Sequence, residues 1–401
     1  MKKLLPLIAL IAAACGGTSS GNAPTTSDFQ ANALTFDKVG IAQNDSDDSE
    51  PANTSGSAQA APTALTMSTV SADATRGDTD ACHPHLFLNT DEVIGRVNRH
   101  FTKLVHHVEE VIRNNPSSST PDGTVKVWEN VRLGIDRKLT ITGTVNADGS
   151  VTYAFKLELA GVGTTETFVQ VMSGTLTHSG PPAAEVADAG AAVAIENKGT
   201  VMFDFDALHS VVPSEQARGQ LTDDFDNLND PSKGVKRTAT ITLTDFVPDD
   251  AQEVSHGPRN GAYTWEREPG VGGFFQYEDS FILNCPSNSA RAIADVKAVA
   301  RWYRAADGSV HGRSDAQATG GQIPTGDKWE GVTCAQGPSS SAPAEGEWLM
   351  KEEDATGASL FIGHIQVGVT PCDTIFGKVP DENDSTNDYD FTAAVAFPNE
   401  F

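Results

Sequence analysis

The chain has 401 residues, which is enough for one large domain or two ordinary ones. It contains 54 acidic and 28 basic residues, and its formal net charge is −26 at pH 7. An acidic excess of this size keeps a protein soluble and repels nucleic acids, whose phosphates are bound through basic patches. The composition therefore excludes nucleic acid as an expected partner.

The N-terminus has the pattern of a secretory signal. Lys2 and Lys3 precede an apolar run from Leu4 to Ala14. A short positive segment followed by about ten apolar residues is typical of a signal peptide. The run is too short to cross about 30 Å of hydrocarbon as a helix. We therefore expect residues 1–14 to be a signal peptide that is removed on export.

Three small residues, Ala12 to Ala14, precede Cys15. This arrangement resembles the lipobox of bacterial lipoprotein precursors, although Ala12 stands where that family more often has Leu. The resemblance covers residues 1–20 only. It implies a diacylglyceryl thioether on Cys15 and an acylated amine, so the membrane is the expected partner of the chain. Gly16 stands where Asp often retains such proteins at the inner membrane, which favours a cell-envelope location at the outer membrane.

Residues 15–80 are rich in Ser, Thr, Ala, Asn, Gly and Asp, and their large apolar residues are sparse and without period. Such a segment buries too little apolar surface to offset the entropy of ordering. We predict a lipidated, disordered tether here, followed by a single β-rich domain over residues 81–401. Two stacked β-domains, divided near Asp223–Gly234 or Asp249–Asn260, are the alternative.

One amphipathic helix is predicted over residues 91–114. Asn89 and Glu92 can form a capping box at its start, and Pro116 follows its end. Apolar residues recur at intervals of three and four, which defines one apolar stripe. The stripe consists of Ile94, Val97, Phe101, Leu104, Val105, Val108, Val111 and Ile112.

The sequence after residue 124 predicts strands, because apolar residues alternate with threonine or charged residues. The clearest segments are Arg137–Val145, Ser150–Leu159, Thr200–Asp206 and Val235–Val247, and Asp148-Gly149, Asp307-Gly308 and Thr356-Gly357 are typical of hairpin turns. The expected fold class is mainly β (α+β). We expect a large antiparallel curved sheet or a partly closed barrel, with the long N-terminal helix packed against it.

Four further cysteines, Cys82, Cys285, Cys334 and Cys372, are candidates for two disulfides in an oxidising compartment. Their spacing does not match a zinc site, because no CxxC pair is present. Three pairings are possible. We favour the pairing of Cys285 with Cys334 and of Cys82 with Cys372.

Two kinds of cation site are conceivable, although no cofactor is expected. His100, His107 and Glu110 lie at helical spacing and are candidate metal ligands, as is the segment Cys82–His85, but the HExxH pattern of metalloproteases is absent. Two acidic clusters, Asp223–Asp230 and Asp381–Asp390, offer oxygen ligands of the kind that calcium prefers.

The sequence contains no recognisable catalytic constellation, and we expect the protein not to be an enzyme. The first hypothesis is a non-catalytic envelope lipoprotein that binds a ligand or protein partner, with an apolar or lipid ligand between helix and sheet as one version. The alternatives are a metal-assisted envelope hydrolase that uses the histidine-rich helix, and a calcium-dependent structural or adhesive surface protein.

Overall fold

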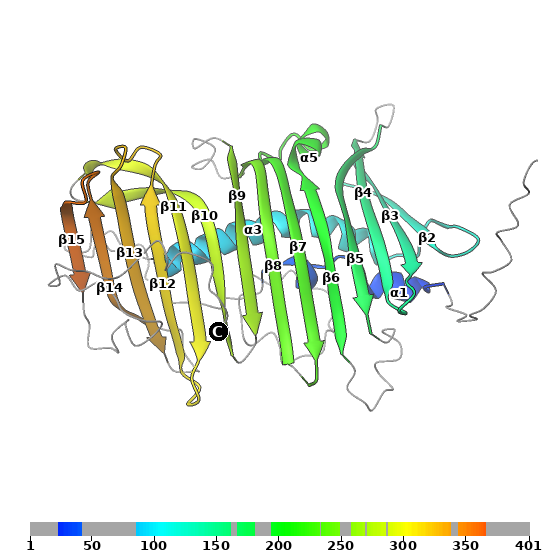
Figure 1. Ribbon diagram of the computed structural model, residues 1–401. Helices are drawn as coiled ribbons and strands as arrows, with labels where there is room; N and C mark the ends of the chain where they lie inside the picture. The colour runs from blue at the N-terminus through cyan, green and yellow to red at the C-terminus, as the bar shows by residue number, and fades with distance from the viewer. Residues whose placement is uncertain are drawn as a thin grey trace, which may run out of the picture.

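The structure is a computed structural model. It describes residues 23–41, 86–161, 167–180, 194–232, 234–248, 258–268, 271–285, 288–337 and 344–365. The described chain is mainly β, and fifteen strands form one open antiparallel sheet (Figure 1). Every strand lies beside its neighbours in sequence, so the sheet is a meander without crossover connections. The predicted large antiparallel sheet is confirmed.

The elements have the following bounds. The helices are α1 Thr26–Ala31, α2 Phe36–Val39, α3 Leu86–Ile112 and α5 Phe205–Val211. The strands are β1 Ser118–Ser119, β2 Val125–Arg132, β3 Ile135–Val145, β4 Val151–Gly161, β5 Val169–Ser179, β6 Ile195–Asp204, β7 Arg218–Asp230, β8 Gly234–Val247, β9 Arg259–Glu268, β10 Gly272–Cys285, β11 Asn288–Arg304, β12 Val310–Thr319, β13 Lys328–Gly337, β14 Ala344–Glu353 and β15 Ser359–Ile365.

Strands form where apolar and polar residues alternate, because successive side chains in a strand point to opposite faces. In β3, Leu139 and Ile141 are buried, whereas Thr140 and Thr142 are partly exposed. The turn that follows contains Gly149 at φ +88°, a conformation that glycine adopts without steric cost. Asp148 supports the turn, since its Oδ1 accepts a hydrogen bond of 3.0 Å from the Ser150 backbone N–H.

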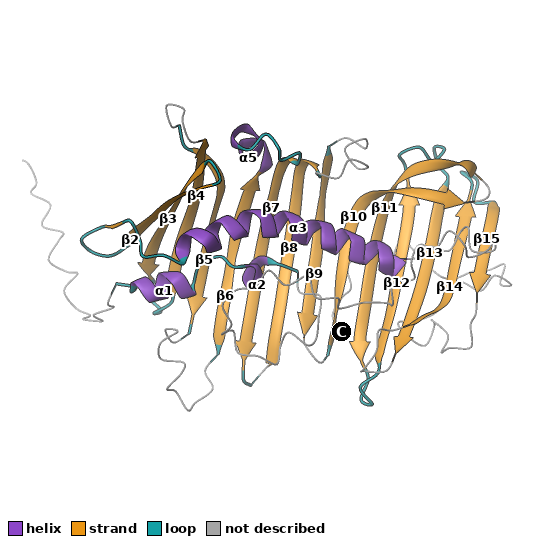
Figure 2. Ribbon diagram, turned by 180° about the vertical axis from the view of Figure 1, so that it is seen from behind, coloured by secondary structure: helices purple, strands orange, loops and turns teal. Residues whose placement is uncertain are grey.

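Helix α3 crosses one face of the sheet and contacts β2 and β3 near one edge and β11, β12 and β13 near the other. Figure 2 shows α1, α2 and α3 on this same face. We call it the helix face and the opposite side the outer face. Apolar residues of α3 at intervals of three and four are buried against the sheet, which is the arrangement of an amphipathic helix. They include Val93, Val97, Phe101, Leu104, Val108 and Val111.

Part of the predicted tether is folded onto the helix face. Thr25 and Asp28 form a capping box at the start of α1, and Phe29 packs edge-on against Tyr153 with ring centroids 5.4 Å apart. Asn98 of α3 both accepts a hydrogen bond from the Ile41 N–H and donates one to the Ile41 carbonyl, each 3.0 Å long. Residues 23–41 therefore belong to the folded domain, which corrects the prediction of a disordered tether over all of residues 15–80.

Two other expectations differ from the structure in detail. Helix α3 begins at Leu86 and ends at Ile112, whereas residues 91–114 were expected. The sheet is open, with β1 and β15 at opposite edges, and is not a partly closed barrel. Among the helices that the structure describes, none combines the length and apolar character needed to cross a bilayer.

Candidate functional site

The predicted metal ligands on α3 lie in different surroundings. His100 is 1% exposed, and its ring packs edge-on against Phe205 and Phe246 at centroid distances of 5.4 and 5.0 Å. His107 Nδ1 accepts a hydrogen bond of 2.9 Å from Arg137 Nε. Burial, followed by the charge of Arg137, lowers the pKa of His107 to about 4, so this imidazole is neutral at pH 7.

Glu110 faces basic groups. It is ion-paired with Arg132 of β2, and its Oε1 lies 3.1 Å from His106 Nε2. These contacts bind Glu110 to the edge of the sheet and place positive charge where a metal ion would have to sit. The expected site of His100, His107 and Glu110 is therefore not formed, and the described residues contain no group of three His, Cys, Asp or Glu side chains arranged for a metal.

The acidic cluster Asp223–Asp230 is part of strand β7 and is not a loop. Asp223 lies on one face of the sheet, whereas Asp224, Asp226 and Asp230 lie at alternate positions along the other face. Because no group of three His, Cys, Asp or Glu side chains arranged for a metal is present among the described residues, the expected calcium site is not formed there. Asp223 lies on the helix face with Leu221 and Phe225, while Asp224 is exposed on the outer face. The other acidic cluster, Asp381–Asp390, lies outside the described residues.

Cys334 of β13 is disulfide-bonded and buried. Cys15, Cys82, Cys372 and the segment Cys82–His85 lie outside the described residues, and Cys285 is described only as the last backbone position of β10. The pairing of the cysteines therefore stays a prediction.

A buried ionic cluster, which sequence reasoning missed, joins α3 to the middle of the sheet. Arg96 Nη1 donates a hydrogen bond of 2.7 Å to Asp279 Oδ2, and Arg259 is ion-paired with Asp279 Oδ1. Tyr263 donates its hydroxyl hydrogen to Asp279 Oδ2 over 3.1 Å. The Asp279 side chain is completely buried. Burial, followed by the charge of Asp279, raises the pKa of Tyr263 well above its ordinary value, so Tyr263 stays a donor.

A second buried ionic cluster lies on the outer face of β11 and β12. Asp315 Oδ1 accepts hydrogen bonds from Arg313 Nε at 3.0 Å and Nη2 at 2.7 Å, and Arg301 Nη1 lies 3.8 Å from Asp315 Oδ2. Burial raises the pKa of Asp315 to about 6, although both guanidiniums oppose this shift. The cluster is a contact between strands, because its three members come from adjacent positions of the sheet.

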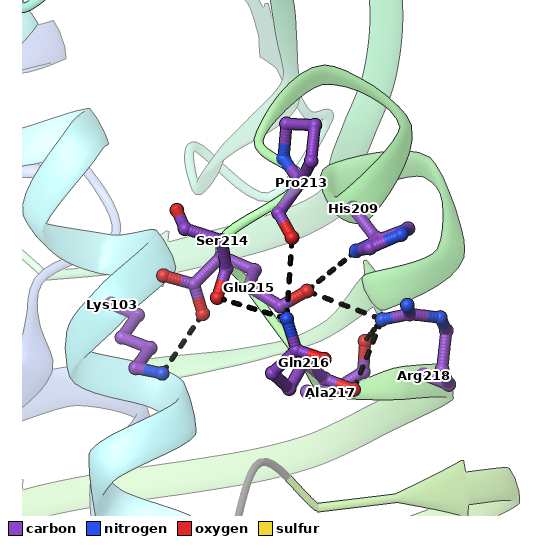
Figure 3. A network of polar contacts seen from close by, with 8 residues as sticks. All are labelled: Lys103, His209, Pro213, Ser214, Glu215, Gln216, Ala217 and Arg218. Atoms are coloured by element: carbon purple, nitrogen blue, oxygen red, sulfur yellow. Dashed lines mark hydrogen bonds and ion pairs between the residues drawn. The ribbon is translucent and has the colours of Figure 1, made fainter.

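A polar network fastens α3 to the connection between α5 and β7 (Figure 3). Lys103 Nζ is 2.9 Å from Glu215 Oε2. The backbone carbonyl of Glu215 accepts a hydrogen bond of 3.2 Å from Arg218 Nη1 and lies 2.6 Å from His209 Nδ1. Arg218 also donates to the carbonyls of Gln216 and Ala217 at 3.0 and 2.7 Å. These bonds hold the connection in one conformation, which is a structural role.

The outer face of β3 to β9 carries rows of hydroxyl side chains. Thr142 and its register partners on the successive strands from β4 to β10 form one line across the sheet, which we call the hydroxyl row. Five of its members carry a hydroxyl, namely Thr142, Thr175, Thr200, Thr240 and Thr264, and the other three are Ala154, Asp224 and Gln276. The Thr200 hydroxyl donates to Asp224. Parallel rows contain further hydroxyls, and Thr152 Oγ1 lies 3.0 Å from Thr177 Oγ1. Neighbouring strands place such side chains about 4.8 Å apart.

Charged side chains on this part of the outer face form pairs among themselves. The pairs are Lys156 with Glu158 at 2.8 Å, Lys198 with Glu196 at 3.2 Å and Lys236 with Glu266 at 2.7 Å. Acidic side chains still outnumber basic ones on this part of the outer face, because Asp136, Asp224, Asp226, Asp230 and Glu268 lie beside the paired residues. This surface offers many hydrogen-bond donors and acceptors over a broad, regular area.

The fold is an open meander sheet whose one face is covered by helix α3 and whose other face is polar over β3 to β9. No protein-family model, no curated protein and no solved structure matches the chain.

Proposed function

We propose that the chain is a non-catalytic, lipid-anchored protein of the bacterial cell envelope, and that it binds an extended, neutral, hydroxyl-rich polymer through the hydroxyl row and the rows beside it. The lipobox-like sequence at Cys15 supports the anchor and the envelope location. The observation that supports the binding role is the set of threonine hydroxyls that recur on neighbouring strands of the outer face from β3 to β9.

The helix face supports this placement of the binding surface. Phe101, Leu104 and Val108 of α3 are completely buried and belong to one continuous core with residues of the strands. The described side chains thus fill the space between helix and sheet where an apolar ligand was expected. The outer face of β3 to β9 keeps polar side chains accessible, whereas Arg313, Asp315 and Val332 are buried on the outer face of β12 and β13. We therefore assign binding to the outer face of β3 to β9.

Glycan strands of the cell wall fit the chemistry of this surface. They are extended, rich in hydroxyl groups and repetitive, so one polymer can form hydrogen bonds with several strands of the sheet at once. Each net hydrogen bond contributes about 0.5–1.5 kcal/mol, and a row of them gives useful affinity by addition. Such a neutral chain is not repelled by the excess of acidic side chains on this face.

The first prediction tests the hydroxyl row. Replacing Thr142, Thr175, Thr240 and Thr264 together by Val removes the hydroxyls and keeps side-chain shape and strand preference. We expect binding to purified peptidoglycan sacculi, measured by co-sedimentation, to weaken about thirtyfold or more, which corresponds to about 2 kcal/mol.

The matched control replaces the same four residues by Ser, which keeps the hydroxyls and should keep most of the binding. Thermal unfolding of both variants checks that the sheet is intact. If the wild-type chain does not sediment with sacculi, or if the Val variant binds as well as the Ser variant, the proposed binding role is wrong.

A further inference from the structure

The hairpin between β2 and β3 has an unusual turn. Leu133 and Gly134 form its two-residue connection, with φ values of +54° and +75°. A two-residue turn with both φ values positive is normally built from Asn-Gly, because asparagine and glycine tolerate the left-handed conformation. A leucine there is strained by about 1–2 kcal/mol, so the fold alone gives no reason for this side chain.

The same hairpin exposes the most apolar surface among the large hydrophobic residues that the structure describes. Leu133 is 86% and Val131 is 62% exposed, whereas Leu360 at the opposite edge of the sheet is 49% exposed. Strain and exposure thus coincide at one residue, Leu133. Because both disfavour leucine in the isolated domain, we expect the side chain to make its contact with something outside the chain.

The charge of the tip is suitable for a lipid headgroup region. Residues 131–135 have the sequence Val-Arg-Leu-Gly-Ile, with one formal charge, on Arg132, and no acid. Arg132 is ion-paired with Glu110, but a guanidinium has five N–H donors and one pair does not use them all. An exposed arginine between apolar side chains can bind lipid phosphate while its neighbours enter the acyl boundary.

The predicted anchor reaches this edge of the sheet. Ala23, where the described chain begins, lies beside the turn before β2, since a Cβ built on Gly123 would be 3.8 Å from the Ala23 Cβ. Residues 15–23 span at most about 29 Å when extended. Strand β2 has 8 residues and is about 26 Å long, and the tip lies at its far end. The bilayer that holds Cys15 is therefore within reach of the whole length of β2, including the tip of the hairpin.

We propose that Leu133 and Val131 form a membrane contact: the tip of the β2–β3 hairpin inserts into the interface of the bilayer that carries the lipid anchor. This inference rests on the anchoring part of the proposed function. It gives the domain a fixed orientation, with the β2 edge toward the lipid and the remaining strands extending away from it. The hydroxyl row would then run away from the membrane.

The test uses the full chain with Cys15→Ser, so that no acyl group contributes to binding. Partition into vesicles of phosphatidylethanolamine and phosphatidylcholine is measured by flotation, with and without Leu133→Asn. We expect Leu133→Asn to lower the partition coefficient about tenfold or more, because burying one leucine side chain is worth at least that factor. Leu133→Phe should retain partitioning.

Leu360→Asn is the matched control, an exposed leucine at the opposite edge of the sheet, and should leave partitioning unchanged. Leu133→Asn is expected to fold at least as well as the parent, because asparagine tolerates the turn conformation, and its thermal midpoint checks this. Equal partitioning of Leu133→Asn and its parent, or none by the parent, overturns the proposal. The proposal is also overturned if Leu133→Asn abolishes self-association of the protein and leaves its binding to vesicles unchanged. That result would assign the tip to a protein partner.

The anchor itself is tested separately by the intact mass of the wild-type chain isolated from membranes. An absence of acyl groups would contradict the anchoring part of the proposed function. The vesicle experiment with Cys15→Ser would still decide whether the hairpin tip binds lipid.

Discussion

Replacing Asp279 by Asn is expected to lower the free energy of unfolding by about 3–5 kcal/mol. The Asp279 carboxylate is completely buried between Arg96 of α3 and Arg259 of β9, and it also accepts the Tyr263 hydroxyl. The neutral amide would remove the carboxylate that these two buried guanidiniums share at the junction of helix and sheet. Urea denaturation followed by tryptophan fluorescence measures the change.

The neighbouring residue of the same strand supplies the control for this prediction. Glu278 is ion-paired with Lys297 at 2.8 Å on the outer face, with both side chains about half exposed. Exposed pairs of this kind contribute at most about 1 kcal/mol, so Glu278→Gln should have little effect. Replacing Arg96 and Arg259 by Met together with Asp279→Leu should recover much of the loss, because the charges of this cluster are then removed together. If Glu278→Gln and Asp279→Asn lower the free energy of unfolding by the same amount, the buried cluster does not stabilise the fold as proposed.

Replacing Asp223 by Val should have the opposite effect and stabilise the protein at pH 7 by about 1–3 kcal/mol. Asp223 is 0% exposed, and neither of its carboxyl oxygens has a hydrogen-bond partner among the described residues. Its register partners on the adjacent strands are Val201 and Ile241, both buried. An apolar side chain suits this position on the helix face better than a carboxyl group does.

The pH dependence of stability tests the same residue. Burial, followed by the nearby charge of Asp224, raises the pKa of Asp223 well above its ordinary value of 3.8. The folded state therefore binds this proton more tightly than the unfolded state does. The contribution of Asp223 to stability is fully present below pH 3.8 and is lost as the pH rises toward the folded-state pKa.

Asp223→Asn should remove the contribution of residue 223 to the pH dependence of stability. Asp223→Val should remove the same contribution and, in addition, the free-energy cost of burying a polar group. Glu278→Gln, at an exposed acid on another strand, serves as the control and should change the stability by at most about 1 kcal/mol. Unfolding curves at several pH values between 4 and 8 give the comparison. An unchanged pH profile in Asp223→Asn would show that Asp223 is not the group that titrates.

The strands were predictable because alternation is a local property of the sequence. Thr140 and Thr142 between Leu139 and Ile141 indicate a half-buried strand whatever lies beside it. Closure of the sheet is not local. Whether the first and last strands meet depends on twist and strand number over the whole sheet, and the alternation pattern carries no information about either.

The folded part of the predicted tether could not be recognised because its apolar residues have no period. Phe29, Leu34, Val39 and Ile41 are separated by irregular intervals, yet each is buried. They do not build a core of their own but add to the one between α3 and the strands. The capping box of Thr25 and Asp28 was the local signal that could have been used.

The buried charges were missed for a related reason. Asp223 and Asp279 occupy positions where alternation predicts apolar residues, between Leu221 and Phe225 and beside Tyr277 on the helix face. This mismatch was the available signal. Whether such a residue has a countercharge depends on α3 and β9, which are distant in sequence. Only the structure therefore distinguishes Asp279, which is ion-paired, from Asp223, whose carboxyl oxygens have no hydrogen-bond partner among the described residues.

The meander order also determines how the sheet can form. Each strand pairs with the strand before it, so every new strand finds its partner close by in the chain, and each loop closure is short. Helix α3 is the exception, because it precedes the sheet in sequence and contacts strands from β2 to β13. Its apolar stripe cannot be covered until the sheet is nearly complete. The docking of α3, and not the pairing of strands, is therefore the step at which an incompletely folded chain is most prone to aggregate.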